Sequence, residues 1–227
     1  MWVKICGNMN LEDAVRAAEL GADAVGFVFA PSPRQMTAAQ VAEITPHLPS
    51  TIERVGVFDS RGADEIAAMV QEAGLTAVQL HGGLDEGLIV ALAERFGGRV
   101  SIIQTLHWVV GEAASPGRLA GEIWRIAELV GERGMVDRVL IDSKVGEAGG
   151  GTGRTFDWAS ARAVLAAVPS GVRLIVAGGL GPGNVAEAIA QLRPWGVDVA
   201  SGVEAPGRKD PVLVAQFIQN ARGLKNP

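Results

Sequence analysis

Trp2-Val3-Lys4-Ile5-Cys6-Gly7 is the first of a series of short apolar runs that decide the fold of this 227-residue chain. A run rich in β-branched residues and closed by a turn residue is typical of a buried strand. Alternation along the strand places Lys4 and Cys6 on one face and Val3 and Ile5 on the other. If the apolar face packs on helices, the only cysteine lies beside a cation that favours its thiolate. The alternative is a lone cysteine that acts only as a small buried hydrophobe.

Seven further apolar runs follow, and after each of the eight comes a segment of helical periodicity. We expect strands at 2–6, 23–29, 53–58, 76–81, 99–106, 136–142, 172–177 and 196–200. We expect helices near 10–20, 37–46, 62–73, 85–96, 118–132, 156–168, 182–193 and 211–222. Thr37 with Gln40 fits a capping box, and Asp210 before Pro211 is typical of a helix start.

Eight strand–helix units in a chain of this length predict an α/β fold, namely a single (β/α)8 barrel that spans residues 1–227. An open, doubly wound parallel sheet is the alternative, because it shares the alternation of strands and helices. We find no linker, no low-complexity tract and no sign of a second domain.

The composition is that of a globular protein, with 48% hydrophobic and 20% charged residues. A net charge of −5 argues against nucleic acid or an anionic membrane as the main partner. No uncharged apolar run approaches the roughly 20 residues of a membrane helix, and we expect no signal peptide and a cytoplasmic location. One cysteine excludes an internal disulfide framework, and three scattered histidines predict no metal site.

Two reactive side chains stand where predicted strands end, which in a barrel is the end that carries active sites. Asp142 closes an apolar run, where burial raises the pKa of a carboxyl group as a general acid requires. A solvated loop aspartate or a helix cap is the alternative. Cys6 and Asp142 belong to the first and sixth strands, so we expect them to flank a small ligand as one base and one acid.

Glycines follow the last two predicted strands in the pattern of the common phosphate site of barrels, where backbone amides hold the anion. The residues concerned are Gly178, Gly179, Ser201 and Gly202. The Gly-rich run 149–153 is not a nucleotide P-loop, because Ala148 and Arg154 stand at positions that need glycine and lysine. We expect it to form a mobile loop over a ligand, or else a plain flexible turn.

Three further polar residues at predicted strand ends are candidates for ligand contact. Arg34 follows two prolines that stiffen its loop and suits a planar carboxylate, although a solvated loop arginine is the commoner case. His81 either contacts a ligand or is a hydrogen-bonded core histidine, and Gln79 shares its face. His107 belongs to no comparable cluster and begins the irregular segment 107–121.

Taken in order, these strand ends resemble one family, the phosphoribosylanthranilate isomerases of tryptophan biosynthesis, from Lys4 to Asp210. Any one motif is common, whereas the ordered set is specific. The motifs are Lys4–Gly7, Gly21–Phe29, Ser32–Arg34, Val55–Phe58, Gln79–Gly82, Leu140–Ser143, Gly150–Gly153, Thr155–Trp158, Ala177–Leu180, Asn184-Val185, Val197–Glu204, Gly207 and Lys209-Asp210.

The resemblance implies a cofactor-free Amadori rearrangement of N-(5-phosphoribosyl)anthranilate to 1-(2-carboxyphenylamino)-1-deoxyribulose 5-phosphate. In it Asp142 protonates the ring oxygen and Cys6 removes the proton from C2, while Arg34 holds the anthranilate carboxylate. Lys4, Gln79 and His81 complete the expected substrate-binding set, and the glycine loops hold the phosphate. We expect this small-molecule substrate, no metal and no cofactor, and either a monomer or a homodimer.

Two departures from the family pattern are visible. Met9 stands where the family often has threonine, and the segment between the fifth and sixth strands is longer than is typical. The rival hypotheses are another sugar-phosphate isomerase or epimerase barrel and a non-catalytic phosphate-binding barrel. An epimerase of this kind resembles metal enzymes with several strand-end histidines and acids, and a histidine-pathway isomerase resembles enzymes with a pair of aspartates; this chain has neither set. A non-catalytic barrel would not need the acid and the base that stand at two of its strand ends.

Overall fold

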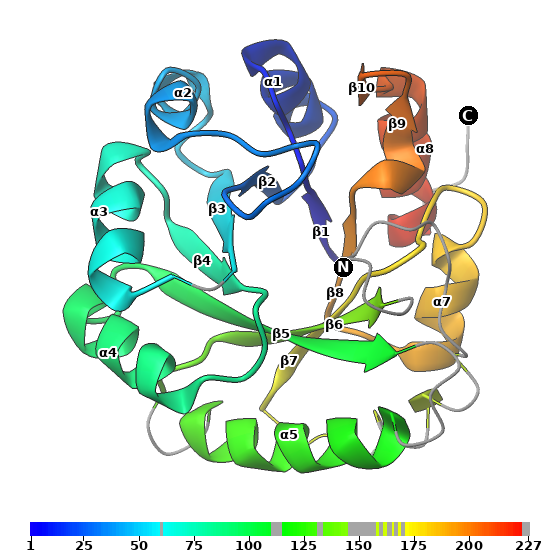
Figure 1. Cartoon of the computed structure of the whole chain (residues 1–227). Coiled ribbons are helices and arrows are strands. Elements are labelled where there is room, and N and C mark those ends of the chain that lie inside the picture. Colours follow the sequence, from blue (N-terminus) through cyan, green and yellow to red (C-terminus); the bar gives the residue numbers. More distant parts are fainter. Residues whose placement is uncertain are drawn as a thin grey trace.

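The computed structural model describes residues 1–59, 61–109, 115–130, 134–144 and 171–223, together with the single residues 158, 161, 162, 165 and 168. Eight parallel strands pair in chain order and the eighth pairs with the first, which closes a barrel. Helices surround the strands (Figure 1). The predicted (β/α)8 barrel is therefore confirmed and the open sheet is excluded. Division into a single domain over 1–227 stays a prediction.

The strands agree with the predicted ones to within three residues at each end. Their bounds are β1 Trp2–Ile5, β2 Ala24–Val28, β3 Glu53–Phe58, β4 Ala77–Leu80, β5 Ser101–Val109, β6 Arg138–Lys144, β7 Arg173–Val176 and β8 Gly196–Val199. The helices are α1 Leu11–Glu19, α2 Ala38–Ala42, α3 Ala63–Glu72, α4 Glu86–Phe96, α5 Ser115–Val130, α7 Val185–Leu192 and α8 Pro211–Arg222. No helix of the described ranges is both long and apolar enough to cross a membrane.

The two predicted helix starts have the expected caps. Thr37 and Gln40 form a capping box at the start of α2, and the Asp210 side chain accepts from two backbone amides before Pro211 in α8. The predicted helix at 156–168 and the glycine run 149–153 lie outside the described residues, apart from the five single positions.

The core has two layers, as alternating strands require. Val3 and Ile5 belong to the large layer between the strands and the helices. Small and medium apolar side chains fill the inside of the barrel, contributed by Ala24, Val55, Ala77, Ile103, Leu140, Ile175 and Ala177. Lys4 points into the barrel and is fully buried, so the predicted two faces of β1 are confirmed.

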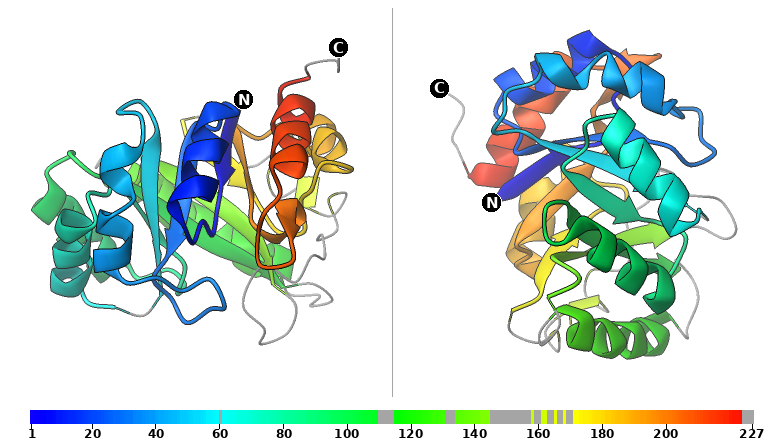
Figure 2. Two further views of the ribbon diagram at one scale, coloured as in Figure 1. Left: turned by 90° about the horizontal axis from the view of Figure 1, so that it is seen from above. Right: turned by 90° about the vertical axis from the view of Figure 1, so that its left-hand side faces the viewer.

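The N-terminal end of the barrel is closed by aromatic side chains. Trp2 and Trp195 stack with ring centroids 5.4 Å apart, and the Arg138 guanidinium lies over both rings, at 5.1 and 5.8 Å. Arg138 is also paired with Glu53 through both carboxylate oxygens. Figure 2 (left) shows the N-terminus at this end and the loop between β2 and α2 at the opposite one. In the described part of the chain these side chains close the N-terminal end, so a ligand site is expected at the C-terminal ends of the strands.

One prediction about local structure is wrong. The segment from His107 is not irregular at its start, because β5 runs on to Val109 and pairs with β6 as far as Lys144. Continued pairing with a neighbour, which is not a local property, lengthens the strand. The sequence analysis assigned no element to the stretch just before α8. The structure forms a short 3-10 helix there, η2 (Ser201–Val203), and a hairpin of β9 (Glu204–Ala205) and β10 (Arg208–Lys209).

Candidate active site

The C-terminal ends of the strands surround a cavity of about 400 Å³. Eight of the ten predicted site residues line it, namely Cys6, Arg34, Gln79, His81, Asp142, Gly178, Gly179 and Ser201. Lys4 and Gly202 are not among its lining residues. The cavity also includes Asp198 of β8, which the sequence analysis did not single out. Its signal was a lone acid between Val197 and Val199, inside an apolar strand.

Lys4 lies below the cavity, and its ammonium group forms an ion pair with a carboxylate. Lys4 Nζ is 2.9 Å from Asp198 Oδ1, and the two residues are directly paired across β1 and β8. Burial lowers the pKa of Lys4, but Asp198 and then Cys6 raise it more, so its pKa lies above the usual value. Lys4 is thus a buried cation beneath Cys6, outside the residues that line the cavity, and its predicted contact with the substrate stays a prediction.

Cys6 follows β1 and is held close to the floor of the cavity. Its backbone N–H donates to Val199 of β8 at 2.8 Å, and the buried Asn8 side chain donates to the carbonyl groups of Ile5 and Gly26. Gly26 makes room for the thiol, because a Cβ there would lie 2.7 Å from Cys6 Sγ. These hydrogen bonds fix the backbone on both sides of Cys6, and its thiol lies against Gly26.

The sequence predicted that the cation beside Cys6 would favour its thiolate, and Lys4 does lower the pKa of Cys6, although other effects outweigh it. Burial raises the pKa of the Cys6 thiol, Lys4 lowers it, and Asp198 raises it again, which leaves the pKa above its usual value. The sign of the Lys4 effect was right, but desolvation of a fully enclosed thiolate outweighs it. Near neutral pH the resting side chain is a thiol.

Asp142 lies near the end of β6, and two strands separate β6 from β1 around the barrel. Burial and, after it, the nearby Asp198 carboxylate raise the pKa of Asp142, while Lys4 and the Ser143 backbone N–H lower it, which leaves the pKa at about 7. The direction is the one that the apolar strand end predicted. At neutral pH this carboxyl group holds its proton about half of the time.

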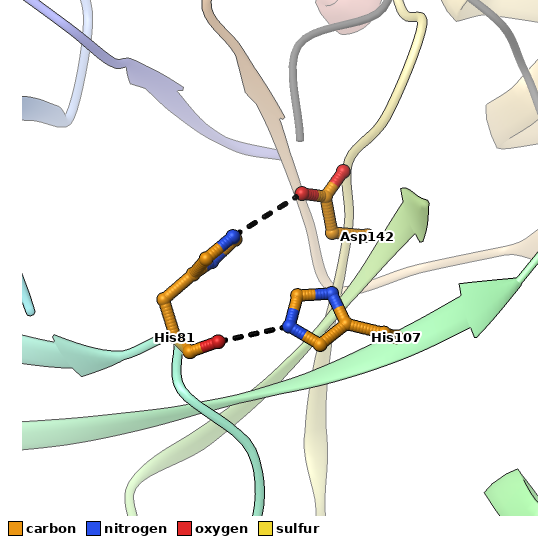
Figure 3. Close-up of side chains that lie close together, drawn as sticks. All are labelled: His81, His107 and Asp142. Carbon is orange, nitrogen blue, oxygen red and sulfur yellow. Dashed lines mark hydrogen bonds and ion pairs between the residues drawn. The ribbon is translucent and has the colours of Figure 1, made fainter. Parts of the chain in front are cut away.

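Two histidines form the wall next to Asp142, shown in Figure 3. His81 Nε2 lies 3.9 Å from Asp142 Oδ2, and His107 Nε2 donates to the His81 carbonyl at 2.8 Å. The two rings meet edge to face with centroids 4.7 Å apart. The prediction that His107 joins no cluster is therefore wrong, because extended β5 pairs His107 directly with Asp142.

The three side chains have ligand atoms within 4.8 Å of one another. Ligands of one tetrahedral zinc ion lie roughly 3.3 Å apart, given zinc–nitrogen bonds of about 2.0–2.1 Å. The one separation between His81 and Asp142 already exceeds this value by more than half an ångström. The cluster is wider than a zinc site, and we interpret it as a polar wall beside the carboxyl group.

Glycines allow the loops after β7 and β8 to pack closely on their neighbours, β6 in one case and the loop after β7 in the other. Gly178 has a φ of +84° and lies against Ser143, where a Cβ would overlap the serine side chain and backbone. Gly202 lies against the Leu180 carbonyl in the same way, so the loop after β8 packs on the loop after β7 although Gly202 itself does not line the cavity. Asn184 accepts from the Gly181 N–H and donates to the Gly179 carbonyl, so it fixes this loop.

Arg34 is engaged by an acidic partner that the sequence analysis gave no role. Its Nε and Nη2 donate to the two carboxylate oxygens of Glu204 at 2.7 and 2.6 Å. Lys209 Nζ donates to the same carboxylate at 2.7 Å. Gln79, another predicted contact, donates to Thr105 Oγ1 at 3.2 Å and reaches the cavity from β4.

The fold and the cavity together define a (β/α)8-barrel enzyme with a polar site at the C-terminal ends of its strands. The family model described as N-(5'phosphoribosyl)anthranilate (PRA) isomerase matches residues 3–220. The chain belongs to this family and is an isomerase. This membership decides against the other sugar-phosphate barrels and the non-catalytic barrel considered above.

Individual relatives agree over nearly the whole length. The N-(5'-phosphoribosyl)anthranilate isomerase of Thermotoga neapolitana is 41% identical, with 98% of both chains covered. The crystal structure of phosphoribosyl anthranilate isomerase from Thermotoga maritima is 38% identical, with a TM-score of 0.82 over 99% of this chain and 100% of that one. A phosphoribosyl anthranilate isomerase in complex with reduced 1-(o-carboxyphenylamino)-1-deoxyribulose 5-phosphate is 35% identical, with a TM-score of 0.79 and the same coverage.

Proposed function

We propose that this chain rearranges N-(5-phosphoribosyl)anthranilate to 1-(2-carboxyphenylamino)-1-deoxyribulose 5-phosphate in tryptophan biosynthesis, with Asp142 as general acid and Cys6 as general base. The observation that carries the assignment of roles is that both residues line one cavity, from strands that are separated by only β7 and β8 around the barrel. Asp142 has the raised pKa that a carboxylic acid needs to donate a proton near neutral pH.

In the first step Asp142 donates its proton to the furanose ring oxygen. The bond between that oxygen and C1 breaks, and the lone pair of the anthranilate nitrogen forms a protonated Schiff base with C1. This step consumes the neutral carboxyl group, which burial supplies. The resulting positive nitrogen withdraws electrons and makes the proton on C2 more acidic.

In the second step the Cys6 thiolate removes the proton from C2. The electrons of the C–H bond form a double bond between C1 and C2 and neutralise the nitrogen, which gives an enolamine. Loss of the proton from the C2 hydroxyl and gain of a proton at C1 then give the ketone. The raised pKa of Cys6 makes the thiolate scarce but strongly basic once formed.

The remaining cavity residues bind the two anionic ends of the substrate. Arg34 is the proposed partner of the anthranilate carboxylate, since a guanidinium group binds a carboxylate through two parallel hydrogen bonds. Gly178, Gly179 and Ser201 are proposed to hold the phosphate, with Gly202 supporting their loop. Gln79 and His81 are proposed to contact the sugar between these ends, whereas Lys4 acts on Cys6 from below.

The test is to generate phosphoribosylanthranilate in situ and to follow the loss of its fluorescence with the whole chain. Cys6→Ser and Asp142→Asn are each expected to lower turnover roughly 10²- to 10⁴-fold while binding of a product analogue is largely kept. Full activity of Cys6→Ser would remove the thiol from the mechanism, and full activity of Asp142→Asn would remove the acid.

The chain is also expected to be a monomer or a homodimer. This stays a prediction from the sequence, and light scattering on the purified chain would check it. A larger assembly would contradict it.

A further inference from the structure

One edge of the Arg34 guanidinium group is fully occupied in this structure. Nε and Nη2 bind the two oxygens of Glu204 side by side, which is the bidentate arrangement of a strong arginine–carboxylate pair. A guanidinium group has five N–H donors. The pair with Glu204 uses two of them, so both donors of Nη1 and one of Nη2 remain, on the edge at the end of the side chain.

The placement of the two residues shows where this remaining edge lies. Arg34 lines the cavity, whereas Glu204 does not. The edge that binds Glu204 is thus turned to the β9–β10 hairpin, away from the ligand space. Gly7 allows this arrangement, because a Cβ at that position would lie 2.5 Å from Arg34 Cδ.

Glu204 is itself fixed, by a lysine that is almost completely buried. Lys209 is 3% exposed, and its Nζ donates to Glu204 Oε1 at 2.7 Å and to the Ala200 carbonyl at 3.0 Å. Its backbone N–H donates to Asp13 Oδ2 at 3.1 Å. Antiparallel pairing places Lys209 opposite Glu204 in the hairpin. The carboxylate therefore has a defined position before any ligand binds.

The charges of this cluster favour an anionic ligand. Arg34 and Lys209 are cationic and Glu204 is anionic, so the three together carry one positive charge. Burial raises the pKa of Glu204, but its hydrogen bonds to Arg34 and Lys209 lower it more, which keeps the carboxylate ionised. Without Lys209, the negative charge of Glu204 would cancel the attraction of Arg34 for a second carboxylate.

We propose that Glu204, held by Lys209, is a positioning residue that presents the Nη1–Nη2 edge of Arg34 to the ring carboxylate of the substrate. The cluster thereby selects an aromatic amine that carries a carboxylate next to its nitrogen. A fixed guanidinium loses less conformational entropy on binding than a mobile one, so the preference comes from preorganisation. This inference rests on the proposed function, because it takes Arg34 as the partner of the anthranilate carboxylate.

The experiment compares two ligand pairs on the whole chain. One pair is phosphoribosylanthranilate and the corresponding phosphoribosylaniline, which lacks the ring carboxylate, and the readout is the ratio of their kcat/KM values. The other pair is the reduced product analogue with and without its ring carboxylate, and the readout is the ratio of their Kd values by calorimetry. Glu204→Gln is expected to lower both ratios roughly ten- to a hundredfold, mainly through KM.

Two further variants separate positioning from folding. Glu204→Asp keeps the charge but withdraws the carboxylate by one methylene, and is expected to lower the ratios less than Glu204→Gln does. If Glu204→Gln does not fold, Glu204→Asp takes its place in the comparison with the unchanged chain. Arg208→Gln is the matched control, because Arg208 lies in the same hairpin but pairs with the exposed Glu12 and not with the cluster. Its ratios are expected to equal those of the unchanged chain.

Three outcomes would overturn the proposal. Tighter binding of the carboxylated ligand in Glu204→Gln would show that Glu204 competes with it for Arg34. Equal losses for both members of each pair would show a purely structural role. Equal binding of both analogues by the unchanged chain would show that no carboxylate is selected. Failure of the proposed reaction is distinguishable, because the chain would then turn over neither substrate while the ratio of Kd values still reports on the cluster.

Discussion

Replacing Asp142 by asparagine is expected to stabilise the folded protein while it removes the general acid. Burial shifts the pKa of Asp142 from 3.8 to about 7, which is about 3 units or about 4 kcal/mol of penalty for the ionised form. The residue is 7% exposed, so solvent screens little of this penalty. Asparagine has nearly the same shape and carries no charge at any pH.

The sign follows from proton linkage. Between pH 4 and pH 7 the folded state keeps a proton that the unfolded state has released, so stability falls as the pH rises and is level above pH 7. With pKa values of 3.8 and about 7, the loss is about 2 kcal/mol at pH 5 and about 4 kcal/mol at pH 8. The advantage of Asp142→Asn should therefore grow by about 2–3 kcal/mol over this range.

The assay is urea denaturation of both proteins at several pH values from 5 to 8, with stability from linear extrapolation. Asp64→Asn is the control, because the Asp64 side chain is 86% exposed and its ion pair with Arg95 lies at the surface, so its effect is expected to stay within about 1 kcal/mol at every pH. New amide hydrogen bonds would add the same amount to the difference at every pH and would leave its growth with pH unchanged. A difference that is equal at pH 5 and pH 8 would refute the reasoning that Asp142 is buried at a cost to its ionised form.

Two further predictions concern the pH profile and the turn after β1. Because the reaction needs a protonated Asp142 and an ionised Cys6, kcat/KM is expected to rise up to about pH 7 and to fall only above the ordinary thiol pKa of 9.0; a decline between pH 7 and 9 in the fluorescence assay would contradict this assignment. Gly7→Ala is expected to raise KM, because its Cβ would displace Arg34, and to cost about 1–2 kcal/mol at a φ of +74°. Gly98→Ala, at a φ of +76° with nothing within 4 Å, should show the stability loss without the change in KM, and equal KM values for both variants would argue against contact with Arg34.

The order of the elements could be predicted because each strand carries its own signal. A short β-branched run with a turn residue after it is a local pattern, and β1 to β8 followed that pattern closely. The end of β5 and the β9–β10 hairpin were missed, because both depend on pairing with a partner strand. Because the end of β5 was missed, the sequence analysis did not recognise His107 as a neighbour of Asp142. The two residues are brought together by the pairing of β5 with β6.

In the candidate site, too, the features that depend on local sequence could be predicted and those that depend on distant residues could not. Cys6 and Asp142 were found because strand ends are visible in the sequence. The ion pair of Lys4 with Asp198 was not, because 194 positions separate the residues and only closure of the barrel makes them neighbours. The net pKa of Cys6 was missed for a related reason: a charge beside a residue can be inferred from alternation, whereas the depth of burial that opposes it cannot.

A single buried ion pair acts on both proposed catalytic groups, and it cannot suit both. Lys4 lowers the pKa of Cys6 and of Asp142, and Asp198 raises both. A low pKa would help the base to ionise, and a high pKa helps the acid to keep its proton, so any change in this pair that favours one group disfavours the other. Burial raises the pKa of both groups, which helps the acid to keep its proton and hinders ionisation of the base. The proposed mechanism can proceed with a high pKa of Cys6, because ring opening by Asp142 produces the cationic Schiff base that acidifies the proton on C2. Only then is Cys6 needed, and a small fraction of strongly basic thiolate meets an activated proton.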